Sequence, residues 1–268
     1  YAVWNATEQW IVKGGVSKGF KTPRLDQLAN GITGFTGQGT RPTIGTPSLK
    51  PETSTSFELG TNYDNKRGAT FGGTLFLNKF KDKIADGPGL LNCSWSAQPN
   101  RPGCVDYGNW PSVDTYGQTV NVDRAETKGF ELSGRFPITT AISASTNYTF
   151  TRSVQKSGAD AGNPLYNTPK HMLNAKLDWK VSPQLSTWAR AEYRSNRFRE
   201  DDVAREAVGN YRAYTQFHIG GSYRVNKQVS INAAIYNLFD KDFLRYASYS
   251  NATGTKTYTN LYNNMQEG

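Results

Sequence analysis

Apolar and polar residues alternate with a period of two along most of this chain. In the stretch 229–246, the residues Val229, Ile231, Ala233 and Ile235 fall on one face of an extended strand, and their neighbours fall on the other. Side chains of a β-strand point to opposite faces in turn, so the segment has one apolar face and one mostly polar face. We interpret 229–246 as one strand of about 18 residues, much longer than the strands of small soluble sheets.

The same alternation recurs along the rest of the chain. No segment shows a convincing apolar stripe with the 3.6-residue period of a helix. Strands are predicted at residues 1–5, 10–20, 54–64, 69–83, 117–136, 141–155, 166–181, 185–200, 211–224 and 229–246, and a last one starts near Lys256. The pattern therefore predicts an all-β protein.

The connections between these strands alternate strictly between short and long. Short turns are predicted near residues 6–9, 65–68, 138–140, 182–184 and 226–228, and long loops near 21–53, 85–116, 156–165, 201–210 and 247–255. An up-and-down meander through an outer membrane has short periplasmic turns at one end and long external loops at the other. A soluble sandwich has no physical reason to sort its loops in this way.

Composition agrees with a membrane-spanning sheet. Only 36% of the 268 residues are hydrophobic, 13% are aromatic, and the mean hydropathy is −0.65. Transmembrane barrels are apolar on the lipid side alone, polar inside, and ringed by aromatic residues. The sequence contains no run of about 18 apolar residues, so no transmembrane helix is predicted. We predict an antiparallel up-and-down transmembrane β-barrel; because about eleven strands with two incomplete edges cannot close, we expect the intact protein to be larger.

The net charge of +9 favours anionic partners. Nucleic acid is not expected, because no Lys/Arg run exceeds two residues and no nucleic-acid motif occurs. A diffuse positive charge suits anionic small ligands or the phosphates of lipopolysaccharide better.

Two cysteines, Cys93 and Cys104, flank a short loop that contains Pro and Gly. This spacing suggests a disulfide formed in an oxidising compartment, and closing such a loop would contribute about 3 kcal/mol in the chain-entropy model. Two free thiols are the alternative. Two cysteines without clustered histidines do not form a metal site.

Three short motifs occur in a fixed order. They are Ser17-Lys18-Gly19-Phe20-Lys21-Thr22-Pro23, Leu49-Lys50-Pro51-Glu52-Thr53-Ser54 followed by Glu58-Leu59-Gly60, and Asn237-Leu238-Phe239-Asp240-Lys241. In sequence, order and spacing they resemble the barrel of TonB-dependent outer-membrane receptors. We expect the motifs themselves to be structural, since Pro51 at the start of a strand costs no ladder hydrogen bond.

The resemblance implies a barrel of about 22 strands around an N-terminal plug domain. Residues 1–268 then form the C-terminal half of that barrel, without the plug, the energy-coupling segment, the first half and the end of the last strand. The resemblance also implies a bacterial outer-membrane location, a monomeric receptor, and coupling to the TonB complex through the plug. The partner would be a ferric siderophore, with iron present only as part of it and no resident cofactor.

The loop 31–40 and the cysteine-flanked loop look most like those of ferric catecholate receptors such as the enterobactin receptors. Receptors for hydroxamate siderophores or cobalamin share the barrel motifs and remain alternatives. A passive porin-like channel, an outer-membrane lipase or protease, and a soluble carbohydrate-binding protein are less well supported. No catalytic constellation accompanies His171 and His218, so no enzyme is expected.

A ferric tris-catecholate is anionic and aromatic, so arginine and aromatic side chains are its expected partners. A group of arginines lies along one predicted strand, its external loop and the neighbouring hairpin: Arg190, Arg194, Arg197, Arg199, Arg205 and Arg152. The alternatives are ion pairs with nearby acids such as Glu192 and Asp202, or binding of lipopolysaccharide phosphate.

The cysteine-flanked loop supplies further candidate ligand residues: Arg101, Tyr107, Trp110 and Tyr116. These side chains could cap a ligand from above. The alternative is a surface loop that packs on its own aromatic residues.

Overall fold

The main sheet is an antiparallel meander that follows the order of the chain. We analysed a computed structural model, which describes residues 1–36, 41–158, 160–199, 202–250, 254 and 256–262. The central path of the sheet runs β1-β2-β5-β6-β8-β9-β10-β11-β12-β13. These strands are β1 (Ala2–Asn5), β2 (Trp10–Lys21), β5 (Glu52–Asp64), β6 (Thr70–Asp86), β8 (Thr115–Pro137), β9 (Ile142–Gln155), β10 (His171–Lys180), β11 (Leu185–Arg194), β12 (Tyr214–Arg224) and β13 (Ser230–Ile235).

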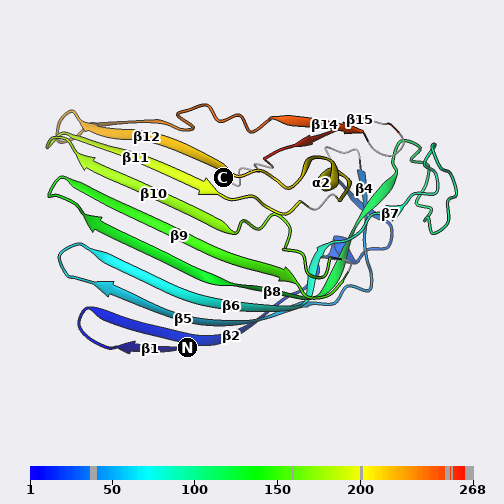
Figure 1. Cartoon of the computed structure of the whole chain (residues 1–268), viewed down its shortest axis with the longest axis horizontal. Coiled ribbons are helices and arrows are strands. Elements are labelled where there is room, and N and C mark those ends of the chain that lie inside the picture. The colour runs from blue at the N-terminus through cyan, green and yellow to red at the C-terminus, as the bar shows by residue number, and fades with distance from the viewer. Residues whose placement is uncertain (37–40, 159, 200–201, 251–253, 255, 263–268) are drawn as a thin grey trace.

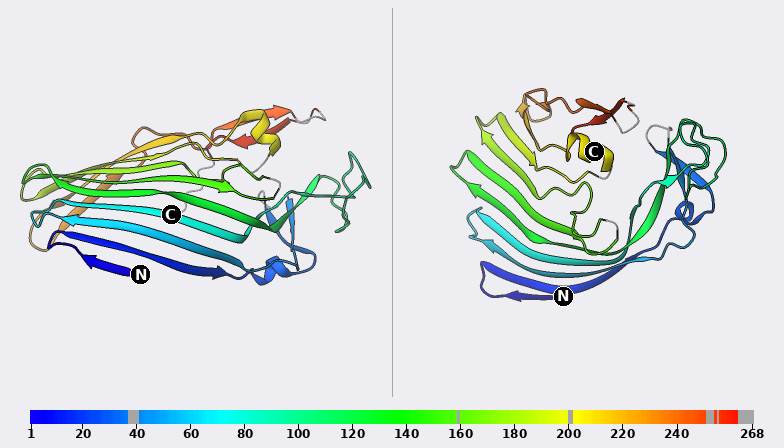
Figure 2. Two further views of the ribbon diagram at one scale, coloured as in Figure 1. Left: turned by 60° about the horizontal axis from the view of Figure 1, so that its bottom comes forward. Right: turned by 45° about the vertical axis from the view of Figure 1, so that its right-hand side comes forward.

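The predicted sorting of the connections is confirmed. The short turns all lie at one end of the sheet and the long connections at the other, on the left and right of Figure 1 respectively. We call these the turn end and the loop end. The sheet curves into an open arc (Figure 2), with β1 and β13 as its two edges. The all-β, up-and-down prediction therefore holds, and the sheet is part of a barrel wall rather than a closed barrel.

One face of the sheet is apolar and exposed. Leu59 pairs across the strands with Leu75, and Leu75 pairs with Phe130. The side chains of Leu59 and Leu75 are 57% and 59% exposed. A second row on the same face runs through Ala144, Leu177, Ala189, Ile219 and Ile235. Transfer of each leucine from water into lipid gains about 1.5–3 kcal/mol, so this face suits a bilayer. We call it the outer face.

Aromatic rings mark both ends of the outer face. At the turn end, the rings of Trp10 and Tyr63 lie 4.7 Å apart. Where β10 begins at its loop end, the His171 ring lies 5.3 Å from Phe150, which in turn lies 5.5 Å from Phe130. Aromatic girdles at the two membrane–water interfaces are typical of transmembrane barrels. His171 is accordingly an interface residue.

The opposite face is polar and concave. It holds a cavity of about 980 Å³ near the turn end, lined among others by Arg135, Lys176, Asp178 and Trp188. Lys176 and Asp178 form an ion pair of 2.6 Å there. Polar side chains that line a lumen alternate with lipid-facing ones along each strand. We call this the inner face.

The prediction of a single long strand at residues 229–246 is wrong. β13 ends at Ile235, because Asn237 and Asp240 adopt left-handed backbone conformations with φ of 53° and 48°. The Asn237 side chain bridges the resulting turn, accepting from Lys241 N at 2.8 Å and donating to Lys241 O at 3.0 Å. Extended backbone cannot continue through these angles. The motif is structural, as expected, but it ends a strand instead of running through one.

The long connections carry small elements that the alternation does not predict. They are α1 (Leu25–Leu28), β3 (Ile32–Thr36), β4 (Arg41–Ile44), β7 (Leu90–Leu91), α2 (Asp202–Val208), β14 (Tyr246–Ser250) and β15 (Lys256–Asn260). The strand predicted from Lys256 exists, but it pairs with β14 in a separate two-stranded sheet. No helix in the described residues has the length and apolar character needed to cross a membrane.

Candidate ligand-binding site at the loop end

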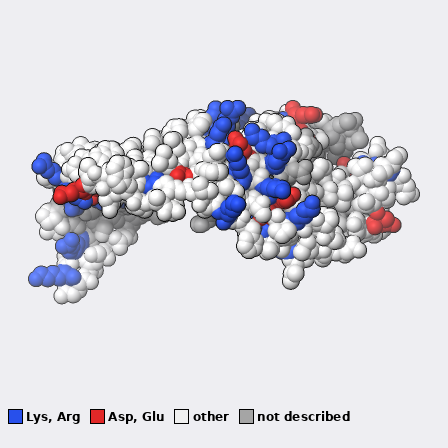
Figure 3. Space-filling view, turned by 90° about the horizontal axis from the view of Figure 1, so that it is seen from below, with Lys and Arg blue, Asp and Glu red and all other residues white. Residues whose placement is uncertain are grey.

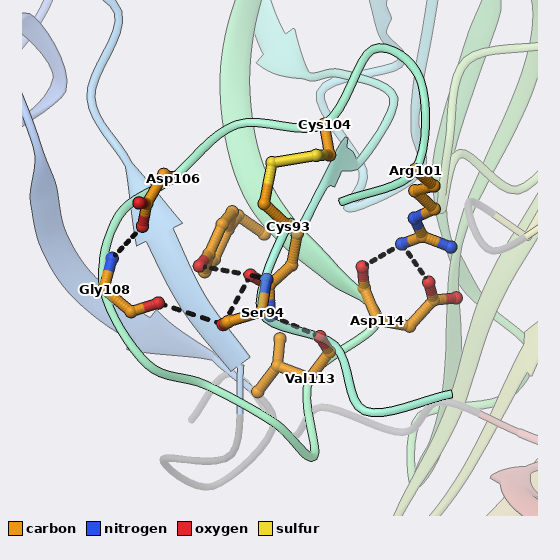
Figure 4. Close-up of a disulfide and its surroundings, with 10 residues drawn as sticks. Cys93, Ser94, Arg101, Cys104, Asp106, Gly108, Val113 and Asp114 are labelled. Carbon is orange, nitrogen blue, oxygen red and sulfur yellow. Dashed lines mark hydrogen bonds and ion pairs between the residues drawn. A yellow bond between two sulfur atoms is a disulfide. The ribbon is translucent and has the colours of Figure 1, made fainter. Parts of the chain in front are cut away.

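Two groups of loops occupy the loop end of the sheet. The first, which we call the disulfide lobe, comprises residues 87–114 and is packed against β4 and the start of β8. Cys93 and Cys104 form a disulfide in it, as predicted (Figure 4). The bridge closes a loop of the lobe and so reduces the conformations that this segment can adopt.

A fully buried asparagine organises the disulfide lobe. Asn92 donates from Nδ2 to the carbonyls of Trp110 and Val113, at 2.8 and 2.7 Å. Its Oδ1 accepts from the Ser94 amide, the Ser94 hydroxyl and the Tyr116 hydroxyl, at 2.9, 2.8 and 2.7 Å. A buried polar group is tolerated only when its hydrogen bonds are made, and here they all are. Asn92 therefore fixes how the lobe closes over β8.

The aromatic side chains predicted to cap a ligand make packing contacts within the lobe. Tyr116 is fully buried and meets the Tyr107 ring edge-to-face at 5.7 Å. Trp110 contacts Phe35 of β3, with ring centroids 5.7 Å apart. Tyr107 and Trp110 remain half-buried. Internal packing thus accounts for Tyr116, while ligand contact by the other two remains a prediction.

Arg101 also has partners inside the lobe. Its guanidinium lies over the Trp95 ring, 4.6 Å from the centroid, and it donates to both the carbonyl and the carboxylate of Asp114 (Figure 4). Only 14% of the side chain is exposed. Its charge is therefore largely used in holding the lobe together.

Replacing Asn92 with alanine is expected to loosen the disulfide lobe locally. The Tyr116 hydroxyl and two carbonyls would lose their buried partner, at a cost of about 2 kcal/mol. Hydrogen exchange followed by mass spectrometry on the intact receptor should show peptides from 90–116 exchanging about 30-fold faster. Gln98→Ala, at an exposed position of the same lobe, is the control and should change nothing. Equal exchange in wild type and Asn92→Ala would contradict this role.

The second group, the arginine lobe, comprises residues 195–212 with the β14–β15 hairpin. Arg199 lies at its centre and is 1% exposed. Its Nε donates to the Gly209 carbonyl and its Nη2 to the Asn260 carbonyl, both at 3.0 Å. Its Nη1 donates to the Thr259 hydroxyl, and the guanidinium lies 4.0 Å from the Tyr211 ring centroid. The side chain therefore joins the loop to the hairpin.

Arg197 plays a similar part. It is 4% exposed and donates to Asn167 Oδ1 at 3.2 Å and to the Tyr262 carbonyl. The rings of Tyr211 and Tyr214 lie 5.7 and 5.6 Å from its guanidinium carbon. Burial lowers the pKa of Arg197, and the two tyrosines act against this shift. A guanidinium stays charged even so, and the surrounding rings and carbonyls compensate that charge.

Arg205 of α2 stacks on an aromatic pair. Its guanidinium lies 4.3 Å from the Phe198 ring centroid, and Phe198 stacks on Tyr166 with an interplanar angle of 6°. The Tyr166 hydroxyl donates to Asp160. Burial and this carboxylate raise the pKa of Tyr166, so the phenol keeps its proton. The stacking of Arg205 on Phe198 therefore fastens α2 to the preceding loop, whereas its ion pair with Asp202 lies within the helix.

The two arginines within β11 face the polar side of the sheet. Arg190 Nη2 lies 2.8 Å from Glu192 Oε1, and 39% of the Arg190 side chain is exposed. Arg194, at the loop end of the strand, is exposed and forms no ion pair with any described carboxylate. Of the predicted arginines on the inner face, Arg194 is the most exposed, and it lies at the loop end.

Arg152 does not join the others. It pairs across the strands with Lys128 and shares its face with Phe150, two residues earlier, so it lies on the outer face. The sequence contained this signal, because parity along β9 separates Arg152 from the polar face. We therefore remove Arg152 from the candidate ligand site.

Two further exposed arginines lie at the arginine lobe: Arg212, which the sequence already assigns to the external loop of the arginine group, and Arg245, which comes just before β14. Arg212 donates its amide to the Leu261 carbonyl at 2.8 Å, and Leu261 donates its own amide to the Arg245 carbonyl at 3.1 Å. Both side chains are exposed. No local pattern links positions 212 and 245, since only the tertiary fold brings them to the same segment. Among the described residues, no cluster of three His, Cys, Asp or Glu side chains could hold a metal ion.

Comparisons with known proteins also identify a β-barrel. A family model described as TonB dependent receptor-like, beta-barrel matches residues 1–238. An iron-regulated outer membrane virulence protein of Vibrio cholerae is 38% identical over 258 residues, which are 96% of this chain and 37% of that protein. The ferric enterobactin receptor of Pseudomonas aeruginosa is 29% identical over 261 residues, 92% of this chain and 33% of that protein.

Solved structures give the same result. A crystal structure of a variant of the Pseudomonas aeruginosa ferric enterobactin receptor in complex with enterobactin matches with a TM-score of 0.65 and 30% identity. The match covers 89% of this chain and 34% of that one. The chain thus spans about a third of the length of the curated relatives it matches.

Proposed function

We propose, since the chain belongs to the TonB-dependent receptor-like β-barrel family, that it supplies part of the wall and vestibule of an outer-membrane receptor that imports a ferric siderophore. The receptor carries out transport and no covalent chemistry. The observation that supports this most is the distribution of side chains on the sheet. An apolar outer face backs a polar inner face, and exposed arginines lie where the inner face meets the loops.

We propose a catecholate as the siderophore. A ferric tris-catecholate combines negative charge with aromatic rings, and guanidinium groups bind both. Arg194, with Arg190 below it, is placed to contact such a ligand from the wall. Arg197, Arg199 and Arg205 act as positioning residues that hold the arginine lobe in shape. The similarity to receptors named for ferric enterobactin supports this choice.

Energy coupling is proposed from the family. In that scheme a plug domain fills the lumen and contacts the TonB complex. The polar cavity at the turn end of the inner face, with Arg135, Lys176 and Asp178 in its lining, supports this by offering a surface for such a domain. Uptake by the intact receptor should stop when the proton gradient of the inner membrane is collapsed, whereas ligand binding should persist.

The test is uptake of radiolabelled ferric enterobactin by cells in which the intact receptor is the sole catecholate transporter. Arg194→Ala should raise the KM about tenfold, because one charge-assisted contact contributes about 1.4 kcal/mol. Arg194→Lys should recover part of the loss, and Arg224→Ala, at the turn end of the same face, should have no effect. Wild-type cells without uptake would overturn the proposal. An unchanged KM in Arg194→Ala would overturn the role of Arg194.

A further inference from the structure

The inner face carries a strip of cations on β10, β11 and β12. All residues of these strands are described, and every Lys and Arg in them has the parity of the inner face, whereas the outward positions carry none. The five cations are Lys176, Lys180, Arg190, Arg194 and Arg224, and the two inward acids are Asp178 and Glu192. The charged residues of β5, by contrast, are all acids: Glu52, Glu58 and Asp64. An anion in the lumen is therefore drawn toward β10–β12.

The cations of this strip recur along the height of the sheet. Arg194 lies at the loop end of β11, and Arg190 lies four residues, or about 13 Å, closer to the turn end. Arg190 pairs across the strands with Lys176, and Lys180 lies about another 13 Å toward the turn end. Seen from below, by contrast, the molecule shows a largely uncharged stretch between the turn end and the cations near the loop end (Figure 3). The inner face thus provides a series of positive charges that leads away from the loop end.

This series ends in the polar cavity at the turn end. Lys176 and Lys180 line the cavity, and Arg135 of β8 adds a third cation. Asp178 is the one carboxylate in the described lining, and it pairs with Lys176 at 2.6 Å. Arg135 and Lys180 are exposed, and neither forms an ion pair with a carboxylate of the described residues. The cavity therefore keeps a positive charge, and its volume of about 980 Å³ suits a small-molecule ligand.

Aromatic rings lie beside the cations of the cavity. Trp188 and Tyr236 both line it, and their ring centroids lie 6.4 Å apart. Lys176 Nζ lies 6.0 Å from the Trp188 ring centroid. Trp188 pairs across the strands with Gly220, and a Cβ at Gly220 would lie 2.5 Å from Trp188 Cζ2, so a larger residue there would displace the indole. Cations beside aromatic rings suit a ligand that is both anionic and aromatic.

We propose that this cavity is a second binding site for the transported ligand, which we call the exit site. It holds the anionic, aromatic ligand near the periplasmic turns, after the ligand has left Arg194 at the loop end. Arg135 and Lys180 attract its negative charge, and Trp188 and Tyr236 contact its rings. The inference rests on the proposed function, with a catecholate as ligand and a plug domain that has moved away from the cavity. The exit site therefore acts on passage through the barrel and not on capture.

The test separates capture from passage in cells whose sole catecholate transporter is the intact receptor. Cells with a collapsed proton gradient are loaded with radiolabelled ferric enterobactin, washed and re-energised. The rate at which bound label becomes resistant to exchange with unlabelled ligand is then measured. Arg135→Gln/Lys180→Gln should load as wild type does but import the bound ligand about tenfold more slowly, because it lacks two charged contacts of the exit site. Arg135→Lys/Lys180→Arg keeps both charges and should import at the wild-type rate.

Further variants test the place of the charges and the part of the ring. Lys66→Gln/Arg67→Gln removes as many charges from the exposed turn between β5 and β6, at the same end of the sheet but outside the cavity, and should import as wild type does. Trp188→Ala should slow import about fivefold, whereas Trp188→Phe keeps an aromatic ring and should slow it less. All variants are checked for a folded barrel by their heat-dependent mobility in gels.

The outcomes distinguish the exit site from the proposed function. Import at the wild-type rate by Arg135→Gln/Lys180→Gln would overturn the exit site alone, as would equal slowing in the turn control. Reduced loading of this variant would assign the two cations to capture, and slow import by the charge-keeping variant would assign them to packing; either result would contradict the exit site. Wild-type cells that fail to load or to import ferric enterobactin would overturn the proposed function itself, and the exit site with it.

Discussion

Replacing Arg199 with alanine is expected to detach the β14–β15 hairpin from the loop 195–212. The carbonyls of Gly209 and Asn260 would lose a charged donor, and Tyr211 would lose the cation on its ring. Removing one side of a buried charged network costs about 3–5 kcal/mol. Because α2 and the hairpin are joined at this point, the cost falls on the arginine lobe and not on the sheet.

Hydrogen exchange on the intact receptor measures this effect. Peptides from β14 and β15 should exchange at least about a hundredfold faster in Arg199→Ala than in wild type. The exchange rate of Arg199→Lys should lie between those of wild type and Arg199→Ala, because lysine keeps the charge but lacks the planar guanidinium group. Arg245→Ala removes an exposed arginine of the same lobe and should leave exchange unchanged. If Arg199→Ala exchanged like wild type, Arg199 would not be the residue that joins the two segments.

The second large effect is expected from a charge placed on the outer face. Leu75 is 59% exposed and is flanked across the strands by Leu59 and Phe130. An arginine in the lipid-facing band of a barrel costs about 2–4 kcal/mol near the bilayer midplane. Leu75→Arg should therefore lower the amount of folded intact receptor in the outer membrane by at least about tenfold.

A neighbouring position provides the control. Thr74 lies one residue earlier on the inner face and pairs with Glu131 across β8, so Thr74→Arg adds the same charge opposite a carboxylate. This variant, and Leu75→Met, should accumulate like wild type, as measured by gel mobility and denaturant unfolding in vesicles. Equal loss in Leu75→Arg and Thr74→Arg would show that the outer face does not contact lipid.

The strands were predictable because each carries its own period-two signal. The alternation of apolar and polar residues around Leu59 and Leu75 is enough to predict that both side chains face outward. The alternation of short and long connections predicts the order of the strands in the sheet. The end of β13 was not predicted, since the apolar pattern continues past Asn237 while its backbone turns into the left-handed region. Local hydrogen bonding to Lys241 overrides the pattern there.

The candidate site was less predictable. Arg197 and Arg199 were predicted to lie on the strand 185–200, but β11 ends at Arg194. Their burial was not predicted, because their partners Tyr262, Thr259 and Asn260 lie some sixty residues away in sequence. Burial of this kind is a property of the tertiary fold.

The central claim is that the loop end binds a ferric catecholate, and tryptophan fluorescence tests it most directly. The intact receptor, purified from outer membranes, would be titrated with ferric enterobactin, a ferric hydroxamate and cyanocobalamin. We predict tight, saturable quenching by ferric enterobactin alone. Tight binding of the hydroxamate or of cyanocobalamin in its place, or no response to any of the three, would contradict the claim.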